Sequence, residues 1–224
     1  VNNILLFSSK GNVNHLGKRN NPPMTASLIF SLSTFLLISG ITPGPNNMLL
    51  TSSGANFGFR RSLPLWVGIL LGIQTILLLS AFGVGAVLLL YPAMHTVLKV
   101  LGSLYLLRLA WKTSTAHYKR LETANLAAVP IKSHQGWLLQ FLNPKAWMMG
   151  LGAVGSYSLQ GDLYNHSVVV ISVVMLISNM IAGTVWIVLG SLIGSLLKSR
   201  NAWFIFNITM GILTAVCVPL LWIS

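Results

Sequence analysis

The sequence is poor in charge and almost free of acidic residues. Only 7% of its 224 residues are charged, and 14 lysines and arginines stand against two acidic side chains; an ordinary soluble domain carries about 25% charged residues. Hydrophobic residues make up 54% of the chain, and the mean hydropathy is +0.75. Alternating strand patterns of the barrel type are absent as well. These features exclude a typical soluble domain and predict an all-α integral membrane protein.

The shortage of cysteine and carboxylate excludes several kinds of site. The single cysteine, Cys217, lies in the last apolar run, so the chain has no internal disulfide, and we interpret it as a small buried side chain. The two acids, Glu122 and Asp162, lie in loops between apolar runs. Hydrolytic or transfer chemistry inside a membrane needs converging acids, histidines or a metal cluster within the spans. We therefore expect neither an enzyme nor a cofactor or metal site.

Long apolar runs recur along the whole chain. A helix needs about 20 residues to cross a hydrocarbon core of about 30 Å. Tyr91-Pro92 separates the second run from the third, because an interfacial aromatic residue is followed there by a helix breaker. We predict a polytopic protein with six transmembrane helices, over residues 27–50, 65–90, 93–111, 136–158, 167–197 and 203–222.

Lysines and arginines alternate along the loops between these runs. The first, third and fifth loops carry them, and the second and fourth carry none. By the positive-inside rule, the odd-numbered loops then face the cytoplasm and both termini lie on the outer side. A nucleic-acid-binding patch has no reason to alternate, so the net charge of +12 indicates topology in a lipid bilayer and not a nucleic-acid partner. The loop cations are Arg60, Arg61, Lys112, Lys119, Arg120, Lys132, Lys198 and Arg200.

Residues 1–23 do not fit this topology. They are polar and carry Lys10, Lys18 and Arg19 on the predicted outer side. Their apolar stretch, residues 4–7, is too short for the h-region of a signal peptide and precedes the charges. We expect residues 1–23 to be a mis-assigned or dispensable extension, disordered if present, and residues 24–224 to form one six-helix transport domain that begins at Met24.

The first apolar run contains a helix breaker near its middle, in the sequence Thr42-Pro43-Gly44-Pro45-Asn46-Asn47. Two prolines remove backbone donors and clash with the preceding turn, and the glycine between them relaxes the backbone further. In hydrocarbon, the freed backbone groups are tolerated only where protein or a water-filled cavity surrounds them. The sequence therefore predicts a first helix that is broken at Pro43-Gly44-Pro45, with a binding site or pathway at the break.

A second break, at Asn143-Pro144, lies about one hundred residues later. Each break is followed by two uninterrupted runs, which gives three helices in each half. Because three is an odd number, the halves would lie in opposite orientations, as inverted repeats do. We predict two inverted three-helix repeats, over about residues 24–112 and 136–224. A simpler interpretation of Pro144 is an ordinary helix start, where proline is common.

These breaks can bind both charged groups of a zwitterionic ligand. Its carboxylate needs donors, which we expect from the backbone N–H groups around Asn46 and Asn47, and its ammonium needs acceptors, which we expect from carbonyls near Ser39 to Ile41. Asn143 can add an amide contact, and Lys145 a charge near the cytoplasmic mouth. The predicted binding residues are Thr42, Pro43, Gly44, Pro45, Asn46, Asn47, Asn143, Pro144 and Lys145. Gln74 and Asn179 are lining candidates, although intramembrane amides often only join helices.

Three blocks of sequence, ITPGPNNMLLTSSGANFGFRRSLPLWVGILLG, LKVLGSLYLLRLAWK and LLQFLNPKAW, resemble the LysE/RhtB family of amino-acid exporters. The resemblance extends from Met24 to the C-terminus and is strongest to the branch that exports cysteine and O-acetylserine or homoserine and threonine. It implies export of small neutral amino acids across the bacterial inner membrane, driven by protons in antiport. Two residues depart from the pattern: Asn46, where many relatives have aspartate, and Arg108, which we interpret as an interfacial anchor.

The route of the coupling proton is the least defined feature. Asparagine cannot carry a proton at physiological pH, so Asn46 can bind but cannot relay. Asp162 and His166, near the outer end of the fifth run, form the predicted external proton port; alternatively, the substrate itself takes up or releases the proton. An uncoupled channel, a scaffold and, least favoured, an enzyme stay open as alternatives. Glycine pairs at Gly68/Gly72 and Gly190/Gly194 indicate close helix packing and are compatible with a homodimer.

Overall fold

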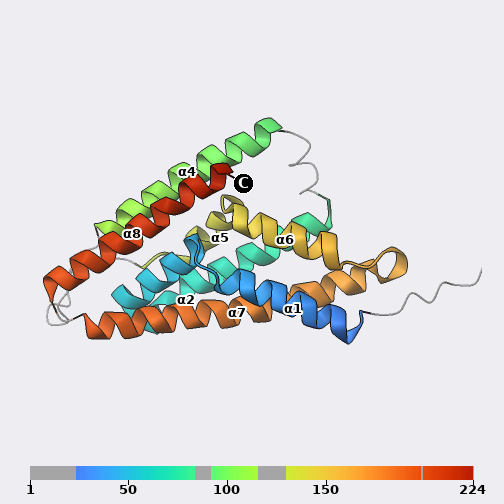
Figure 1. Ribbon diagram of the computed structural model, residues 1–224, viewed down its shortest axis with the longest axis horizontal. Helices are drawn as coiled ribbons and strands as arrows, with labels where there is room; N and C mark the ends of the chain where they lie inside the picture. The colour runs from blue at the N-terminus through green and yellow to red at the C-terminus, as the bar shows by residue number, and fades with distance from the viewer. Residues whose placement is uncertain (1–23, 84–91, 116–129, 198, 224) are drawn as a thin grey trace, which may run out of the picture.

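The computed structural model describes residues 24–83, 92–115, 130–197 and 199–223. All regular structure within these residues is helical, which confirms the all-α class (Figure 1). The predicted extension at residues 1–23, Glu122 and the loop cations Lys119, Arg120 and Lys198 lie outside the described residues. The elements are α1 (Ala26–Ile41), α2 (Pro45–Ala81), α4 (Pro92–Ser114), α5 (Ser133–Phe141), α6 (Pro144–Tyr157), the short 3-10 helix η2 (Gly161–Leu163), α7 (Tyr164–Leu196) and α8 (Arg200–Ile223).

Helix α2 consists of two arms that fold back on each other at Gly58. This residue has φ 76° and ψ 174°, a left-handed conformation that only glycine adopts at low cost. The hydroxyl groups of Ser53 and Ser62, on either side of the turn, lie 2.8 Å apart, which a continuous helix would not permit. One residue therefore reverses the chain between the first two predicted spans. Arg60 and Arg61 were expected in a loop, and they lie instead in the first turn of the second arm.

Both predicted interruptions are present as real helix ends. α1 ends at Ile41 and α2 begins at Pro45, whereas α5 ends at Phe141 and α6 begins at Pro144. In each case proline occupies the first turn of the new helix, where its missing N–H leaves no intrahelical bond unmade. The second break divides the predicted fourth span into two short helices.

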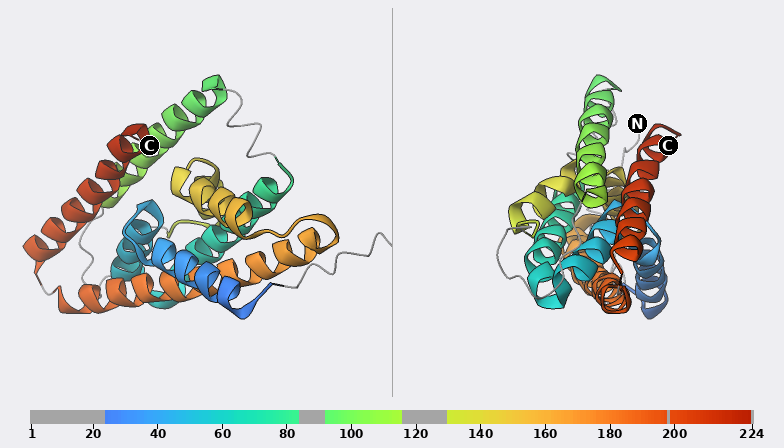
Figure 2. Two further views of the ribbon diagram at one scale, coloured as in Figure 1. Left: turned by 45° about the vertical axis from the view of Figure 1, so that its right-hand side comes forward. Right: turned by 90° about the vertical axis from the view of Figure 1, so that its left-hand side faces the viewer.

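Helix α2 lies at the centre of the bundle. It packs against α5, α6 and α7, and α1 packs across α7 and α6. Helices α4 and α8 form a pair that diverges from the other helices and is joined to them mainly through α8 and α2 (Figures 1 and 2). The side-chain amide of Asn56 in α2 donates to Asn207 Oδ1 in α8 at 3.3 Å, which ties the pair to the bundle.

Glycine allows the central helices to approach closely. A Cβ atom on Gly190 of α7 would lie 2.1 Å from the Thr51 carbonyl oxygen of α2, and one on Gly68 would lie 1.9 Å from the Ser133 carbonyl oxygen of α5. Gly72 and Gly194 make similar contacts with the same neighbours. The two glycine pairs therefore mark helix packing, as predicted. Because these faces are occupied within the chain, they give no support to the expected homodimer.

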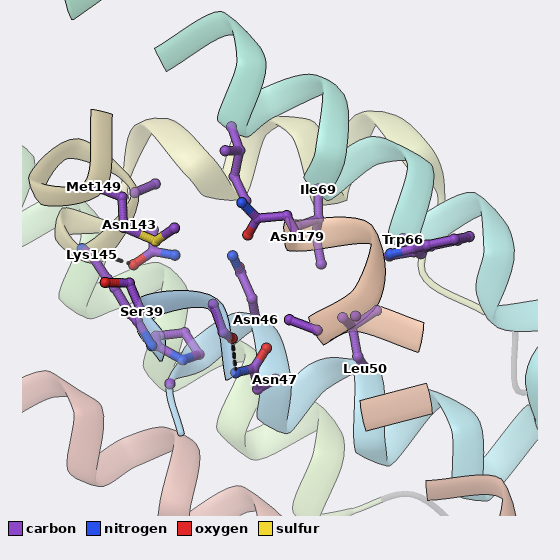
Figure 3. A pocket seen from close by; sticks show the side chains of 17 residues that line it. Ser39, Asn46, Asn47, Leu50, Trp66, Ile69, Asn143, Lys145, Met149 and Asn179 are labelled. Carbon is purple, nitrogen blue, oxygen red and sulfur yellow. Dashed lines mark hydrogen bonds between the residues drawn. The ribbon is translucent and has the colours of Figure 1, made fainter. Parts of the chain in front are cut away.

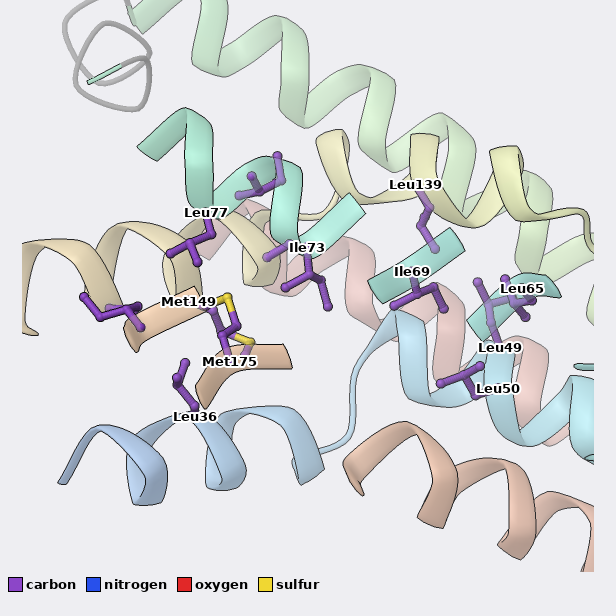
Figure 4. Packing of buried hydrophobic residues seen from close by; sticks show 14 of the residues in the cluster. Leu36, Leu49, Leu50, Leu65, Ile69, Ile73, Leu77, Leu139, Met149 and Met175 are labelled. Carbon is purple, nitrogen blue, oxygen red and sulfur yellow. The ribbon is translucent and has the colours of Figure 1, made fainter. Parts of the chain in front are cut away.

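Polar and apolar side chains are distributed as a lipid environment requires. Leucine, isoleucine and methionine fill the contacts between α1, α2, α6 and α7 (Figure 4). Polar residues such as Asn47, Gln140 and Asn143 are buried, while large apolar side chains such as Leu196 and Phe204 are exposed. Three stretches of the described residues are long and apolar enough to cross a membrane, Pro45–Ala81, Gly161–Leu196 and Arg200–Pro219. The protein is therefore a polytopic membrane protein.

Four of the five described loop cations lie toward one end of the bundle, and the fifth, Lys132, is the N-cap of α5. The C-terminal end of α7 reaches the Gly58 turn, because Gly194 contacts Ala55. The C-terminal end of α4, with exposed Lys112, and the start of α8, with exposed Arg200, lie toward the same end, on the left in Figure 1. Arg60 and Arg61 are exposed beside the turn. This clustering agrees with the alternation that the sequence predicts.

The close approach of α2 and α7 gives a stability prediction. Gly190→Ala should destabilise the protein by about 1–3 kcal/mol, because the new methyl group overlaps the α2 backbone. Gly155→Ala is the matched control, since a Cβ atom there meets nothing within 4 Å, and it should be neutral or stabilising by about 0.5–1 kcal/mol. Thermal unfolding of both variants in detergent measures the difference. Equal melting temperatures would contradict the packing argument.

Candidate functional site

A small cavity lies where the two helix breaks meet (Figure 3). Its volume is about 30 Å³, which accommodates about two water molecules. The cavity is partly open to its surroundings, and in this conformation it is small for an amino acid. Residues from α1, α2, α6 and α7 and from both breaks line it: Ser39, Gly40, Gly44, Pro45, Asn46, Asn47, Leu50, Trp66, Ile69, Ile73, Asn143, Lys145, Ala146, Met149, Asn179, Ala182 and Gly183.

The carbonyl groups freed at the end of α1 are paired with side chains. Asn47 Nδ2 donates to the carbonyl oxygens of Gly40 and Thr42, both at 2.8 Å. The indole of Trp186 in α7 donates to the Ile41 carbonyl oxygen at 3.2 Å. Thr42 Oγ1 donates to the Ser39 carbonyl oxygen at 2.9 Å. The predicted acceptors near Ser39 to Ile41 thus each already accept one hydrogen bond from a side chain in this conformation, and each carbonyl oxygen keeps a second lone pair.

Lys145 places an ammonium group at the first break. Its Nζ donates to the Thr42 carbonyl oxygen at 2.7 Å and to Thr42 Oγ1 at 3.0 Å. The lysine side chain lies over Gly44, where an added Cβ atom would meet Nζ at 3.3 Å. The two oxygens of Thr42 at the break therefore already accept hydrogen bonds from one ammonium group, that of Lys145 in the second half of the chain.

The start of α2 presents uncapped backbone donors to the cavity. Gly44 is the N-cap and has no side chain, and Pro45 follows it, so the N–H groups of Asn46 and Asn47 lack a capping side chain. These donors lie at the positive end of the helix dipole. The start of α6 differs, because Asn143 Oδ1 accepts from the Lys145 backbone N–H at 3.2 Å. Asn143 thus caps its own helix, and Pro144 occupies the first position of an ordinary helix start.

The side chain of Asn46 is paired with Gln140 of α5. Asn46 Nδ2 donates to Gln140 Oε1 at 2.9 Å, and Gln140 Nε2 donates back to Asn46 Oδ1 at 3.0 Å. Gln140 is fully buried and donates a further bond to the Gly136 carbonyl oxygen at 3.0 Å. The Asn46 side chain therefore joins the two halves, and this pair uses its oxygen and one of its two amide N–H donors.

The remaining predicted residues are spread over different places. Asn179 lines the cavity and donates from Nδ2 to the Met175 carbonyl oxygen at 2.9 Å. Gln74 lies outside the cavity and joins α2 to α7, because its side chain exchanges two hydrogen bonds with Ser172. Asp162 and His166 are exposed at the start of α7. They lie about 20 Å from Asn179 along the helix, at about 1.5 Å per residue.

Much of the cavity wall is apolar and was not predicted. Leu50, Ile69, Met149 and Gly183 line it, and a sequence gives no reason to separate such residues from the packed core. Trp66 also lines it, and its Nε1 is buried with no hydrogen-bond partner among the described residues. Within the same part of the chain, no group of three or more histidine, cysteine or acidic residues is placed to hold a metal.

The chain is similar to known transport proteins. A family model described as LysE type translocator matches residues 37–222. A cysteine/O-acetylserine efflux protein of Escherichia coli K12 is 31% identical over 194 residues, which are 87% of this chain and 97% of the relative. The protein of the same name from Shigella flexneri matches with the same identity and coverage. No solved structure matches the chain.

The Asn46–Gln140 pair gives a prediction of energetic coupling. Asn46→Leu should destabilise the protein by about 1–3 kcal/mol, since it leaves the buried Gln140 amide without its partner, and Gln140→Leu should cost less, because Asn46 is only half-buried. The double variant should cost less than the sum of the two, because neither amide then remains. Unfolding of all four proteins in detergent measures the coupling. Strict additivity would show that the pair does not bond across the two halves.

Proposed function

Because the chain belongs to the family of LysE-type translocators, we propose that it is a secondary transporter that exports small neutral amino acids. The substrates are cysteine, O-acetylserine, homoserine or threonine, or close derivatives, and the direction is out of the bacterial cytoplasm. The observation that carries the proposal is the cavity at which two helix breaks meet inside an apolar bundle. A scaffold has no use for breaks at this depth, and paired breaks in two halves of a chain are typical of transport sites.

The proposed binding mode uses both ends of the first break. The substrate carboxylate accepts from the uncapped N–H groups of Asn46 and Asn47 at the start of α2. The substrate ammonium replaces the Lys145 ammonium as the donor to the carbonyl and hydroxyl oxygens of Thr42. Lys145 must then withdraw, which also enlarges a cavity too small for an amino acid. Substrate binding and movement of the second break against the first are thus one event.

We further propose six spans arranged as two inverted repeats. The first span consists of α1 and the first arm of α2, and the fourth of α5 and α6; the second arm of α2, α4, α7 and α8 are the others. Support comes from a reciprocal pair of contacts. The residue after each proline bonds to the end of the helix that precedes the other break: Asn46 to Gln140, and Lys145 to Thr42. A two-fold relation between the halves produces this exchange.

The positions of the charged residues support a proposal for the orientation and the coupling. The cationic end of the bundle faces the cytoplasm, so the start of α7 and both termini face outward. We propose that the export is proton-driven antiport in the inner membrane, with Asp162 and His166 as the outer port. Their exposure at the end opposite the cations supports this position. Since they lie far from the cavity, they admit protons and do not contact substrate.

A transport assay tests the function directly. The purified protein, reconstituted in vesicles with an imposed proton gradient, should transport labelled cysteine, O-acetylserine or homoserine with saturation, and a protonophore should abolish accumulation. The Pro43→Ala/Pro45→Ala variant should lose transport, because a continuous helix removes the break. Asp162→Asn with His166→Gln should reduce gradient-driven accumulation and leave substrate affinity unchanged. Linear, unsaturable flux would indicate a channel, and absence of any flux from correctly inserted protein would reject export.

The role of Lys145 gives a separate prediction. Lys145→Met keeps the length of the side chain but removes its ammonium group. The Thr42 oxygens then lose the hydrogen bonds that join the two breaks in this conformation. We expect at least a tenfold fall in the coupled export rate, a change of about 1.4 kcal/mol, with insertion unchanged. Lys112→Met, at an exposed position outside the cavity, is the control. Export at the unaltered rate in Lys145→Met would remove Lys145 from the mechanism.

A further inference from the structure

Trp66 carries the one buried side-chain polar atom without a partner in the part of the chain that the structure describes. Such groups are rare, because an unmade hydrogen bond in the interior costs free energy that a partner would recover. Other indoles in this protein follow the usual rule. Trp137 donates to Thr75 Oγ1 at 3.2 Å, Trp147 to the Phe141 carbonyl oxygen at 3.0 Å, and Trp186 to that of Ile41 at 3.2 Å. The vacant donor of Trp66 therefore requires a specific explanation.

The position of this donor gives the explanation. Trp66 lies on the second arm of α2 and lines the cavity, and its nitrogen is on the cavity side of the ring (Figure 3). The nitrogen lies over Gly183 of α7, where an added Cβ atom would meet Nε1 at 2.4 Å and Leu50 Cδ1 at 3.4 Å. Glycine thus makes the space in which the indole N–H can face the cavity.

The donor is displaced from the groups that serve the two ends of an amino acid. Those groups are at the break, around Thr42 and the first N–H groups of α2. Trp66 approaches Leu50, about one helical turn farther along α2. The wall between includes the apolar Ile69, Ile73 and Ala182 and the amide of Asn179. A substrate held by its zwitterion at the break directs its side chain along this wall toward the indole.

We propose that the indole N–H of Trp66 donates a hydrogen bond to the side chain of the exported amino acid and thereby sets its specificity. The preferred substrates carry an acceptor at the end of a short side chain, such as a hydroxyl or ester oxygen, and alkyl isosteres are disfavoured because they leave the donor unpaired. This inference rests on the proposed function and defines the substrate class of the same cavity.

An isosteric pair of substrates tests the proposal. Homoserine and norvaline differ only in a terminal hydroxyl in place of a methyl group. In vesicles containing the full chain, transport of labelled homoserine is competed with unlabelled norvaline, and KM and Ki are compared. We expect the wild type to prefer homoserine by about tenfold, in line with one hydrogen bond to a neutral group. Trp66→Phe should bring the ratio close to one by raising KM for homoserine, with Ki for norvaline unchanged.

Two further variants separate this role from a structural one. Trp137→Phe removes an indole N–H that bonds between α2 and α5 outside the cavity, and it should keep the preference. Gly183→Ala should lose the preference as Trp66→Phe does, because its methyl group displaces the indole nitrogen from the other helix. An unchanged ratio in Trp66→Phe, or an equal loss of affinity for both compounds, would overturn the proposal while export stands. A wild type that transports none of cysteine, O-acetylserine and homoserine would reject the proposed function itself.

Discussion

The structure depends on one constraint, which is that a helix broken inside hydrocarbon must find partners for its freed backbone groups within the protein. Here the partners come largely from residues near the two breaks. Asn47 turns back to bond the carbonyl oxygens of Gly40 and Thr42, and Lys145 arrives from the second break to share the Thr42 oxygen. The breaks are thus stable only when they lie together, and this requirement brings residues about one hundred positions apart into one site.

The same constraint explains why the central helices approach so closely. A site made of short side chains and backbone groups is enclosed only if its walls are near one another. Gly54, Gly190 and Gly194 bring α2 and α7 into backbone contact, and Gly68 and Gly136 do the same for α2 and α5. Glycine therefore has a structural role around the cavity rather than a chemical one inside it. The divergent pair of α4 and α8 makes few such contacts with the centre.

The sequence predicts the helical class, the membrane setting and the two breaks, because proline, glycine and long apolar runs act locally. Four of the residues predicted from sequence, Asn46, Asn47, Lys145 and Asn179, line the cavity. The sequence does not predict what these side chains bond to. The Asn46–Gln140 pair and the Lys145–Thr42 contact depend on how two distant segments cross, which no local pattern encodes. The side chains that bond the carbonyl groups near Gly40 were not predicted either.

Two other features were beyond sequence reasoning for different causes. Gly58 is one of many glycines, and only its φ of 76° distinguishes it as the residue that reverses the chain. Trp66 lies in an apolar run of the kind that forms a packed core. Its importance lies in the hydrogen bond that its indole N–H does not make. The backbone angle of Gly58 and the missing hydrogen bond of Trp66 are properties of the folded state, so composition and spacing do not reveal them.

The hairpin within α2 has a consequence for how the protein is made. Its first arm buries Asn47, Thr51, Ser52 and Ser53, and much of the surface that covers this arm belongs to α7, which contacts it through Gly190 and Gly194. During synthesis α7 emerges roughly one hundred residues after the hairpin, so a polar stripe enters the bilayer long before its cover exists. The α7 part of this cover can form only after the second half of the chain has been made. The first half therefore completes its packing when the second half docks on it.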